Sequence, residues 1–311
     1  MTPALPQLID QFLEYLEIEK NCSKLTIRDY RHYLEVFVRW FDLYQKGKTV
    51  ADLNLDIIRK YRVYLANRID IKGGTLKKVT QNYYVIALRS FLRYLIKNDI
   101  KTLEPSKIDL PKTESRSLKF LERDQVDRLV TSVDTSKEEG LRDRAILELL
   151  FSTGLRVSEL VGLNHDKINL ERREFGIIGK GGKGRIVFIS ERAAEFVDMY
   201  LKKRKDVYKP LFIRYSGAVI EDEGGEKMRL TARSIERIVK KYVRIARLPV
   251  DATVHTLRHS FATDLLTNGA DIRSVQEMLG HKNIATTQIY THITNKQLRE
   301  VHKSFHSGNK T

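Results

Sequence analysis

The sequence predicts a mainly α-helical protein with a small β-sheet, divided into two domains. Apolar residues recur at helical spacing along most of the chain, and only residues 175–190 show two β-branched runs around a glycine-rich turn. A length of 311 residues is enough for two domains that each bury a core. The polar stretch 99–118 holds two of the six prolines, which disfavour helix, and it separates a purely helical part from a mixed one.

The first hundred residues predict a small helical bundle, because no strand pattern interrupts their helical periodicity. The second helix opens at Ser23, a residue type that caps helix N-termini. We expect an N-terminal helical domain over residues 1–104, followed by a linker over residues 105–118. The predicted helices of this domain cover residues 5–20, 23–45, 55–69 and 81–98.

Residues 119–311 predict a mixed α/β domain. The glycine-rich turn "GKGGKG" between two apolar runs indicates a β-hairpin over residues 175–190. The acidic segment 215–228 is too polar for a core and is expected to be an inserted loop. Helices are predicted at residues 122–133, 138–154, 192–205, 231–246, 255–269, 271–280 and 295–305.

The charge of the chain indicates a polyanionic partner. Formal net charge is +16, and residues 1–112 already hold 20 lysines and arginines against 13 acidic residues. Because both halves are basic, we expect a long polyanion such as DNA to be held from two sides. No apolar run is long enough to cross a membrane and the N-terminus lacks a signal-peptide pattern, so we expect a cytoplasmic protein without a membrane partner. A single cysteine, Cys22, excludes an intramolecular disulfide.

Two short motifs resemble well-known sites but do not fit them. The glycines of "GKGGKG" match a dinucleotide-binding pattern, yet a strand follows them where that site needs a helix. The turn is therefore expected to present Lys180, Lys183 and Arg185 at a basic hairpin tip. His255 and His259 have the spacing of helical zinc ligands, but Thr256 stands where a metalloprotease has glutamate, so no metal is expected.

The remaining polar residues indicate phosphodiester chemistry. His255 and Arg258 share one helix face, and Arg156 follows the helix-breaking Gly154, with Glu159 one turn later to orient its guanidinium. Two arginines can neutralise a phosphate in a pentacoordinate transition state, a lysine can protonate the leaving oxygen, and a tyrosine can act as nucleophile. Because side chains supply the positive charge, this chemistry requires no metal or other cofactor.

The motifs "TGLRVSELVGL", "GKGGKGR", "HTLRHSFATDLLTNGADIRSVQEMLGH" and "TTQIYTH", in this order, resemble those of the tyrosine recombinases of the phage integrase family. The similarity is greatest to the Xer site-specific recombinases and extends over nearly the whole chain. It implies an N-terminal SAM-like core-binding domain and a mixed α/β catalytic domain. It also implies a supporting acidic residue, Glu159, and a catalytic set of Arg156, Lys180, His255, Arg258, His281 and the nucleophile Tyr290.

The resemblance further implies how such an enzyme works. Double-stranded DNA with inverted half-sites would be bound, cut through a 3′-phosphotyrosine and exchanged through a Holliday junction by a homo- or hetero-tetramer on synapsed DNA. The C-terminal helix, residues 295–305, would serve oligomerisation. Resolution of chromosome or plasmid dimers is the expected task, with a DNA translocase or another accessory protein as a further expected partner.

Three alternatives stay open at this point. The chain could be an integrase or excisionase of a mobile element, or it could relax DNA in the manner of a type IB topoisomerase. A regulator that binds DNA without catalysis is the alternative of another class, although every catalytic position of the motif is filled.

Overall fold

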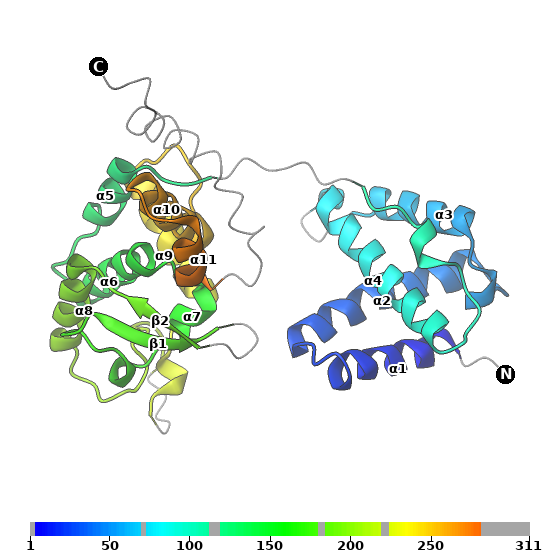
Figure 1. Cartoon of the computed structure of the whole chain (residues 1–311), viewed down its shortest axis with the longest axis horizontal. Helices are drawn as coiled ribbons and strands as arrows, with labels where there is room; N and C mark the ends of the chain where they lie inside the picture. The colour runs from blue at the N-terminus through cyan, green and yellow to red at the C-terminus, as the bar shows by residue number, and fades with distance from the viewer. Residues whose placement is uncertain (1–3, 70–72, 112–118, 180–183, 219–223, 281–311) are drawn as a thin grey trace, which may run out of the picture. The chain divides into compact units, whose positions relative to one another are not determined.

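The computed structural model describes residues 4–69, 73–111, 119–179, 184–218 and 224–280. The chain divides into two compact units, Met1–Arg116 and Ser117–Thr311, and each is described by itself (Figure 1). The mainly helical class with a small sheet is confirmed, since the described residues hold one two-stranded sheet among their helices. The predicted limits of the N-terminal domain, the linker and the catalytic domain stay predictions.

The described residues of the first unit form four α-helices. Ser23 caps the second helix as the sequence predicts, because its side chain accepts a hydrogen bond from the backbone N–H of Thr26 at 3.3 Å. The fourth helix begins at Lys78, three residues before its predicted start. Two short 3-10 turns, Val50–Asp52 and Pro105–Lys107, complete the described part of this unit. The helices are α1 (Leu5–Ile18), α2 (Lys24–Tyr44), α3 (Leu55–Asn67) and α4 (Lys78–Lys97).

Aromatic side chains from all four helices form the core of the first unit. Phe12, Phe37, Tyr61 and Phe91 are each fully buried. The rings of Phe37 and Tyr61 meet edge to face with centroids 5.0 Å apart, and those of Phe12 and Phe91 do so at 5.6 Å. Because these large rings come from different helices, their packing fixes how the helices of the bundle cross.

The second unit surrounds one central helix. Helix α6 (Glu138–Thr153) packs against α8, α10, α5, α9 and strand β2 (Figure 1). Its apolar residues are buried on every side of the helix rather than along one stripe. The other helices are α5 (Arg123–Thr131), α7 (Val157–Val161), α8 (Glu191–Lys203), α9 (Ala232–Ile245), α10 (Val254–Thr267) and α11 (Ile272–Leu279).

The predicted hairpin is present. Strands β1 (Glu174–Ile178) and β2 (Gly184–Phe188) pair antiparallel, with Glu174 opposite Phe188 and Ile178 opposite Gly184. Strand β2 contacts both α6 and α11, so the hairpin is attached to the helical core along its second strand. This attachment brings the strand that follows the glycine-rich turn next to the end of α11.

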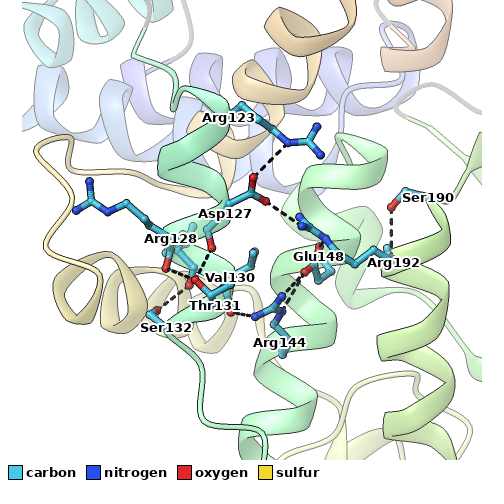
Figure 2. Close-up of polar contacts among 12 residues, drawn as sticks. Arg123, Asp127, Arg128, Val130, Thr131, Ser132, Arg144, Glu148, Ser190 and Arg192 are labelled. Carbon is cyan, nitrogen blue, oxygen red and sulfur yellow. Dashed lines mark hydrogen bonds and ion pairs between the residues drawn. The ribbon is translucent and has the colours of Figure 1, made fainter.

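A network of charges, buried at its centre in α6, joins α5 and α8 to that helix. Glu148 of α6 accepts from Nε of Arg144 and from Nε of Arg192 in α8, each at 2.9 Å. Arg192 also donates to Asp127 of α5 at 2.8 Å, and Asp127 lies 3.5 Å from Arg123. Figure 2 shows these side chains converging between α5, α6 and α8. The network therefore holds α5, α6 and α8 together by directional contacts as well as by apolar packing.

Candidate active site

The guanidinium of Arg258 joins the ends of two helices. Arg258 lies in α10 and is only 3% exposed. Its Nη1 donates to the carbonyl oxygen of Gly154 at 2.6 Å, and its Nη2 donates to that of Leu279 at 2.6 Å. Gly154 ends α6 and Leu279 is the last residue of α11, where carbonyl groups have no partner within their own helix. Arg258 therefore caps both helices and is itself held in one place.

Arg156 is held by the glutamate that the sequence assigned to it. Arg156 precedes α7, and its backbone N–H donates to Oε2 of Glu159 while its Nη1 donates to Oε1, both at 2.8 Å. This capping contact begins the helix and orients the guanidinium at the same time. The side chain of Arg156 stays 29% exposed, whereas that of Glu159 is 7% exposed. The charged end of Arg156 can therefore still reach a ligand.

Glu159 is also bound by Arg185, which sequence analysis placed at the exposed hairpin tip. That expectation is corrected: the Arg185 side chain is only 10% exposed and points from β2 to the helices. Its Nη1 and Nη2 donate to Oε1 and Oε2 of Glu159, both at 3.0 Å. Glu159 thus forms a bidentate pair with Arg185 while it holds Arg156.

These contacts lower the pKa of Glu159. Burial acts first and raises the pKa, but hydrogen bonds and charge from Arg185, together with hydrogen bonds from Arg156, outweigh it and bring the pKa to about 2. The carboxylate is therefore ionised throughout the neutral range and can hold both guanidinium groups.

Three consecutive carbonyl groups at the end of α11 each accept a hydrogen bond from a different arginine. Arg185 Nε donates to Met278 at 3.0 Å and Arg258 Nη2 donates to Leu279 at 2.6 Å. Arg156 Nη2 makes a long contact of 3.5 Å to Gly280. The C-terminal end of a helix is its negative end, so positive side chains stabilise it. The three arginines thus converge on the residues directly before His281.

His255 lies within the electrostatic influence of this cluster. Desolvation lowers the pKa of its imidazole, and the positive charges of Arg258 and Arg156 lower it further. The ring of His259, one turn along α10, meets that of His255 edge to face with centroids 5.4 Å apart. Desolvation, then His255 and Arg258, lower the pKa of His259 to about 4. Both rings are therefore neutral near pH 7.

The structure thus brings together four of the seven predicted site residues. Arg156, Glu159, His255 and Arg258 share one region of the second unit, around the end of α11. The other three, Lys180, His281 and Tyr290, lie outside the described residues, as does the predicted helix 295–305.

Neither a metal-binding cluster nor a membrane helix is found in the described residues. They contain no group of three or more histidine, cysteine, aspartate or glutamate residues placed to hold an ion. Among the same residues, no helix combines the length and the apolar character that crossing a membrane demands.

Comparison with known proteins places this site in a family. Residues 119–297 match the phage integrase family, and residues 9–99 match the phage integrase N-terminal SAM-like domain. The chain belongs to the phage integrase family. Its SAM-like first domain is confirmed by this match, and its catalytic domain is the one that contains the arginine cluster.

Similar proteins narrow the identification to the tyrosine recombinases of this family. The chain is 38% identical over 303 residues to tyrosine recombinase XerD of Listeria innocua, covering 96% of this chain and 98% of that protein. It is 36% identical over 305 residues to tyrosine recombinase XerC of Pelotomaculum thermopropionicum, covering 96% and 97%. The XerH recombinase shares the fold, with a TM-score of 0.71 at 23% identity over 95% of this chain and 84% of the other. This tyrosine recombinase is accordingly a DNA strand transferase of the Xer-like, site-specific type.

Sequence reasoning missed one residue of the site, the inward-facing Arg185. Its position after Gly184 in a glycine-rich turn is typical of an exposed tip, and nothing local indicates a partner 26 residues earlier. The strand pattern of β2 was the signal that could have indicated its inward direction. Side chains alternate between the two faces of a strand, so Arg185 shares a face with the apolar residue Val187, two positions later.

Proposed function

We propose that this tyrosine recombinase resolves dimers of circular chromosomes or plasmids by cutting and rejoining a specific DNA site. Tyr290 is the nucleophile, and Arg156, Lys180, His255, Arg258 and His281 complete the catalytic set, with Glu159 in support. The observation that supports the proposal most is the convergence of Arg156 and Arg258 on the end of α11, with His255 beside them.

In the proposed first step, the phenolic oxygen of Tyr290 attacks the phosphorus of one DNA strand. The bond from phosphorus to the 5′ oxygen breaks, and Lys180 supplies the proton that this oxygen takes up. Arg156 and Arg258 stabilise the negative charge that builds on the non-bridging oxygens, which is the largest single contribution that a preorganised site makes to such reactions. His255 and His281 contribute hydrogen bonds, and a neutral imidazole of this pair takes up the proton that the Tyr290 hydroxyl loses.

The proposed second step is the reverse of the first on a different strand. A 5′ hydroxyl from the partner DNA attacks the phosphotyrosine, the bond to Tyr290 breaks, and the phosphodiester is restored. Because the energy of the phosphodiester is kept in the tyrosyl phosphate, the reaction requires no ATP, and because arginines carry the positive charge, we propose that it requires no metal ion. Two such rounds make and resolve a Holliday junction.

The proposed partners follow from this reaction. Two strand exchanges on two DNA molecules need four active sites, so we propose a homo- or hetero-tetramer on double-stranded DNA with inverted half-sites. A solved XerH structure is described as bound to a palindromic difH substrate after cleavage, which supports duplex DNA as the ligand here. Chromosomal DNA as substrate places the proposed activity in the cytoplasm, with an accessory protein such as a DNA translocase as a further proposed partner.

The experiment that tests the proposal first maps the target site and then traps the covalent adduct on it. The wild-type protein is incubated with genomic DNA of the source organism in EDTA and without ATP, and DNA fragments bound covalently to protein are isolated and sequenced. A duplex with the mapped site and a nick beside the cleavage position then traps the adduct, because the short released strand diffuses away.

We expect one sharp cleavage position in each of two inverted half-sites and a 3′-phosphotyrosine at residue 290. Tyr290→Phe is the matched control and should bind the duplex with wild-type affinity without forming an adduct. An adduct with Tyr290→Phe would overturn the assignment of the nucleophile. Binding without cleavage by the wild type would leave the non-catalytic regulator as the correct function, and a requirement for Mg²⁺ or ATP would refute that part of the proposal.

A further inference from the structure

Arg185 connects the hairpin to Glu159, which holds Arg156, and to the end of α11, which binds Arg258. Its guanidinium holds the two oxygens of Glu159 at 3.0 Å each, and its Nε holds the carbonyl of Met278 at 3.0 Å. The side chain of Arg185 starts from β2 and its three contacts lie on α7 and α11. It therefore joins three separate segments of the chain. Three bonds to two separate segments leave the side chain little freedom to move.

The residues that Arg185 holds are those on which the cluster depends. Glu159 orients Arg156 through two hydrogen bonds of 2.8 Å, so a shift of its carboxylate would move that guanidinium. Met278 is followed by Leu279 and Gly280, the acceptors for Arg258 and Arg156. Arg185 therefore determines the position of Arg156 from one side and that of the α11 end from the other.

A close steric fit supports this placement. Gly280 has a positive φ of 64°, and a Cβ atom added to it would lie 3.0 Å from Nη1 and 3.2 Å from Cδ of Arg185. The backbone of Gly280 thus passes directly over the Arg185 side chain. In the sequence, His281 follows Gly280 directly and Tyr290 comes nine residues after His281.

We propose that Arg185 is a positioning residue for DNA cleavage: it sets the orientation of Arg156 through Glu159 and fixes the end of α11, from which the segment that carries the nucleophile departs. This inference rests on the proposed function. Arg185 does not itself need to contact the DNA, because its three bonds are made within the protein.

The test compares Arg185→Ala with Arg172→Ala in single-turnover cleavage of the nicked duplex. Arg172 is exposed in the turn before β1, at the opposite end of the strand from the glycine-rich turn, and its replacement removes the same charge. Loss of a positioning contact misaligns reacting groups by a fraction of an ångström to an ångström, which lowers rates by about 100-fold. We expect this loss in the cleavage rate of Arg185→Ala, while the DNA affinity of the same variant changes less than about threefold. The cleavage rate of Arg172→Ala should also stay within about threefold of the wild-type rate.

Three further readouts separate positioning from a general loss of structure. Millimolar guanidinium chloride, compared with sodium chloride at equal ionic strength, should restore part of the activity of Arg185→Ala and none of that of Arg258→Ala. The double variant Arg185→Ala with Glu159→Gln should be no slower than Arg185→Ala alone, because both changes break one chain of contacts. Arg185→Lys should stay slow, since one ammonium cannot bind a carboxylate bidentately and a carbonyl as well.

The pH dependence gives an independent check. Burial raises the pKa of the Glu159 carboxyl, and the bonds from Arg185 lower it to about 2 together with those from Arg156. In Arg185→Ala the lowering contacts of Arg185 are lost, so the pKa of Glu159 should rise. As the pH is lowered, cleavage by this variant should therefore fail at a higher pH than cleavage by the wild type.

The outcomes distinguish the two proposals. If the wild type forms no adduct, the proposed function fails. If the wild type forms an adduct and folded Arg185→Ala cleaves as fast as Arg172→Ala, the positioning role is refuted. Should Arg185→Ala fail to fold, Arg185→Lys is judged by the same rate criterion.

Discussion

Nη1 of Arg258 lies 2.6 Å from the carbonyl oxygen of Gly154, the left-handed residue that ends helix α6. A candidate catalytic side chain is thereby fixed by the end of the central helix of its domain. Any change in how α6 ends should displace the guanidinium, so the stability of the core and the geometry of the site are connected at this bond.

Replacement of Gly154 should cost both stability and activity. Its φ of 59° is unfavourable for any residue with a side chain, and a Cβ atom would lie 2.5 Å from Cδ1 of Phe261 and 3.1 Å from Cδ2 of Leu279. Backbone strain and steric crowding together predict that Gly154→Ala lowers the free energy of unfolding by about 2–4 kcal/mol. Urea denaturation followed by circular dichroism measures this change.

Gly176→Ala is the matched control for that experiment. Gly176 lies in β1 with no atom within 4 Å of an added Cβ, and its φ is not positive. We expect it to unfold at the wild-type urea concentration or slightly above, since alanine favours strand over unfolded chain more than glycine does. Equal stability of the two alanine variants would show that the conformation of Gly154 is not a constraint.

Arg258→Lys should abolish most cleavage while DNA binding is retained. Lysine keeps the positive charge but cannot place two donors on the carbonyls of Gly154 and Leu279, so the charge is no longer held in one place. Loss of one preorganised stabilising group lowers reaction rates by about 10²–10³-fold. Single-turnover cleavage of the nicked duplex gives the rate, and a rate within about threefold of the wild type would exclude a catalytic role for Arg258.

The local part of the site was predictable from sequence, whereas its long-range part was not. Gly154 as a helix end and Glu159 as the partner of Arg156 follow from spacing along one short segment, because a helix turn places residues three apart together. The Arg258 contacts span 104 and 21 residues, and that of Arg185 to Met278 spans 93. The periodicity of a sequence contains no information about contacts between residues so far apart along the chain, so only the fold could reveal them.

The same limit applies to the core. Most helices of the sequence prediction are present, because their apolar stripes repeat at helical spacing. Short α7 was not predicted, since five residues give too little periodicity to recognise. Arg142, Arg144 and Glu148 of α6 are all buried, although charged side chains mostly lie at the surface, because Asp143 pairs with Arg142 and Glu148 pairs with Arg144 and with Arg192 of α8.

Removal of Glu148 should strongly destabilise the catalytic domain. Its carboxylate is 2% exposed and binds Arg144 and Arg192, so Glu148→Ala leaves two guanidinium groups without their shared partner (Figure 2). Breaking a buried ion pair by removing one member costs about 3–5 kcal/mol. Thermal or urea unfolding of the variant measures the loss.

The exposed pair between Lys202 and Asp198 provides the control. Their side chains are 75% and 41% exposed, and surface pairs of this kind contribute about 0–1 kcal/mol. We therefore expect Asp198→Ala to be nearly as stable as the wild type. A similar loss of stability for both variants would show that burial of Glu148 does not decide the strength of its contacts.

The stability of the protein should fall between pH 6.5 and pH 4, and His259 should account for part of this fall. The pKa of its imidazole is about 4 in the folded chain, chiefly because of desolvation, and near 6.5 when unfolded. Below pH 6.5 the unfolded chain therefore binds a proton that the folded chain does not, so the stabilising contribution, complete above pH 6.5, is lost as the pH falls toward 4. His255, whose pKa is lowered as well, acts in the same direction. His259→Gln should flatten the dependence of the urea midpoint on pH across this window. Parallel slopes for His259→Gln and the wild type would mean that the buried ring does not set the acid sensitivity of the fold.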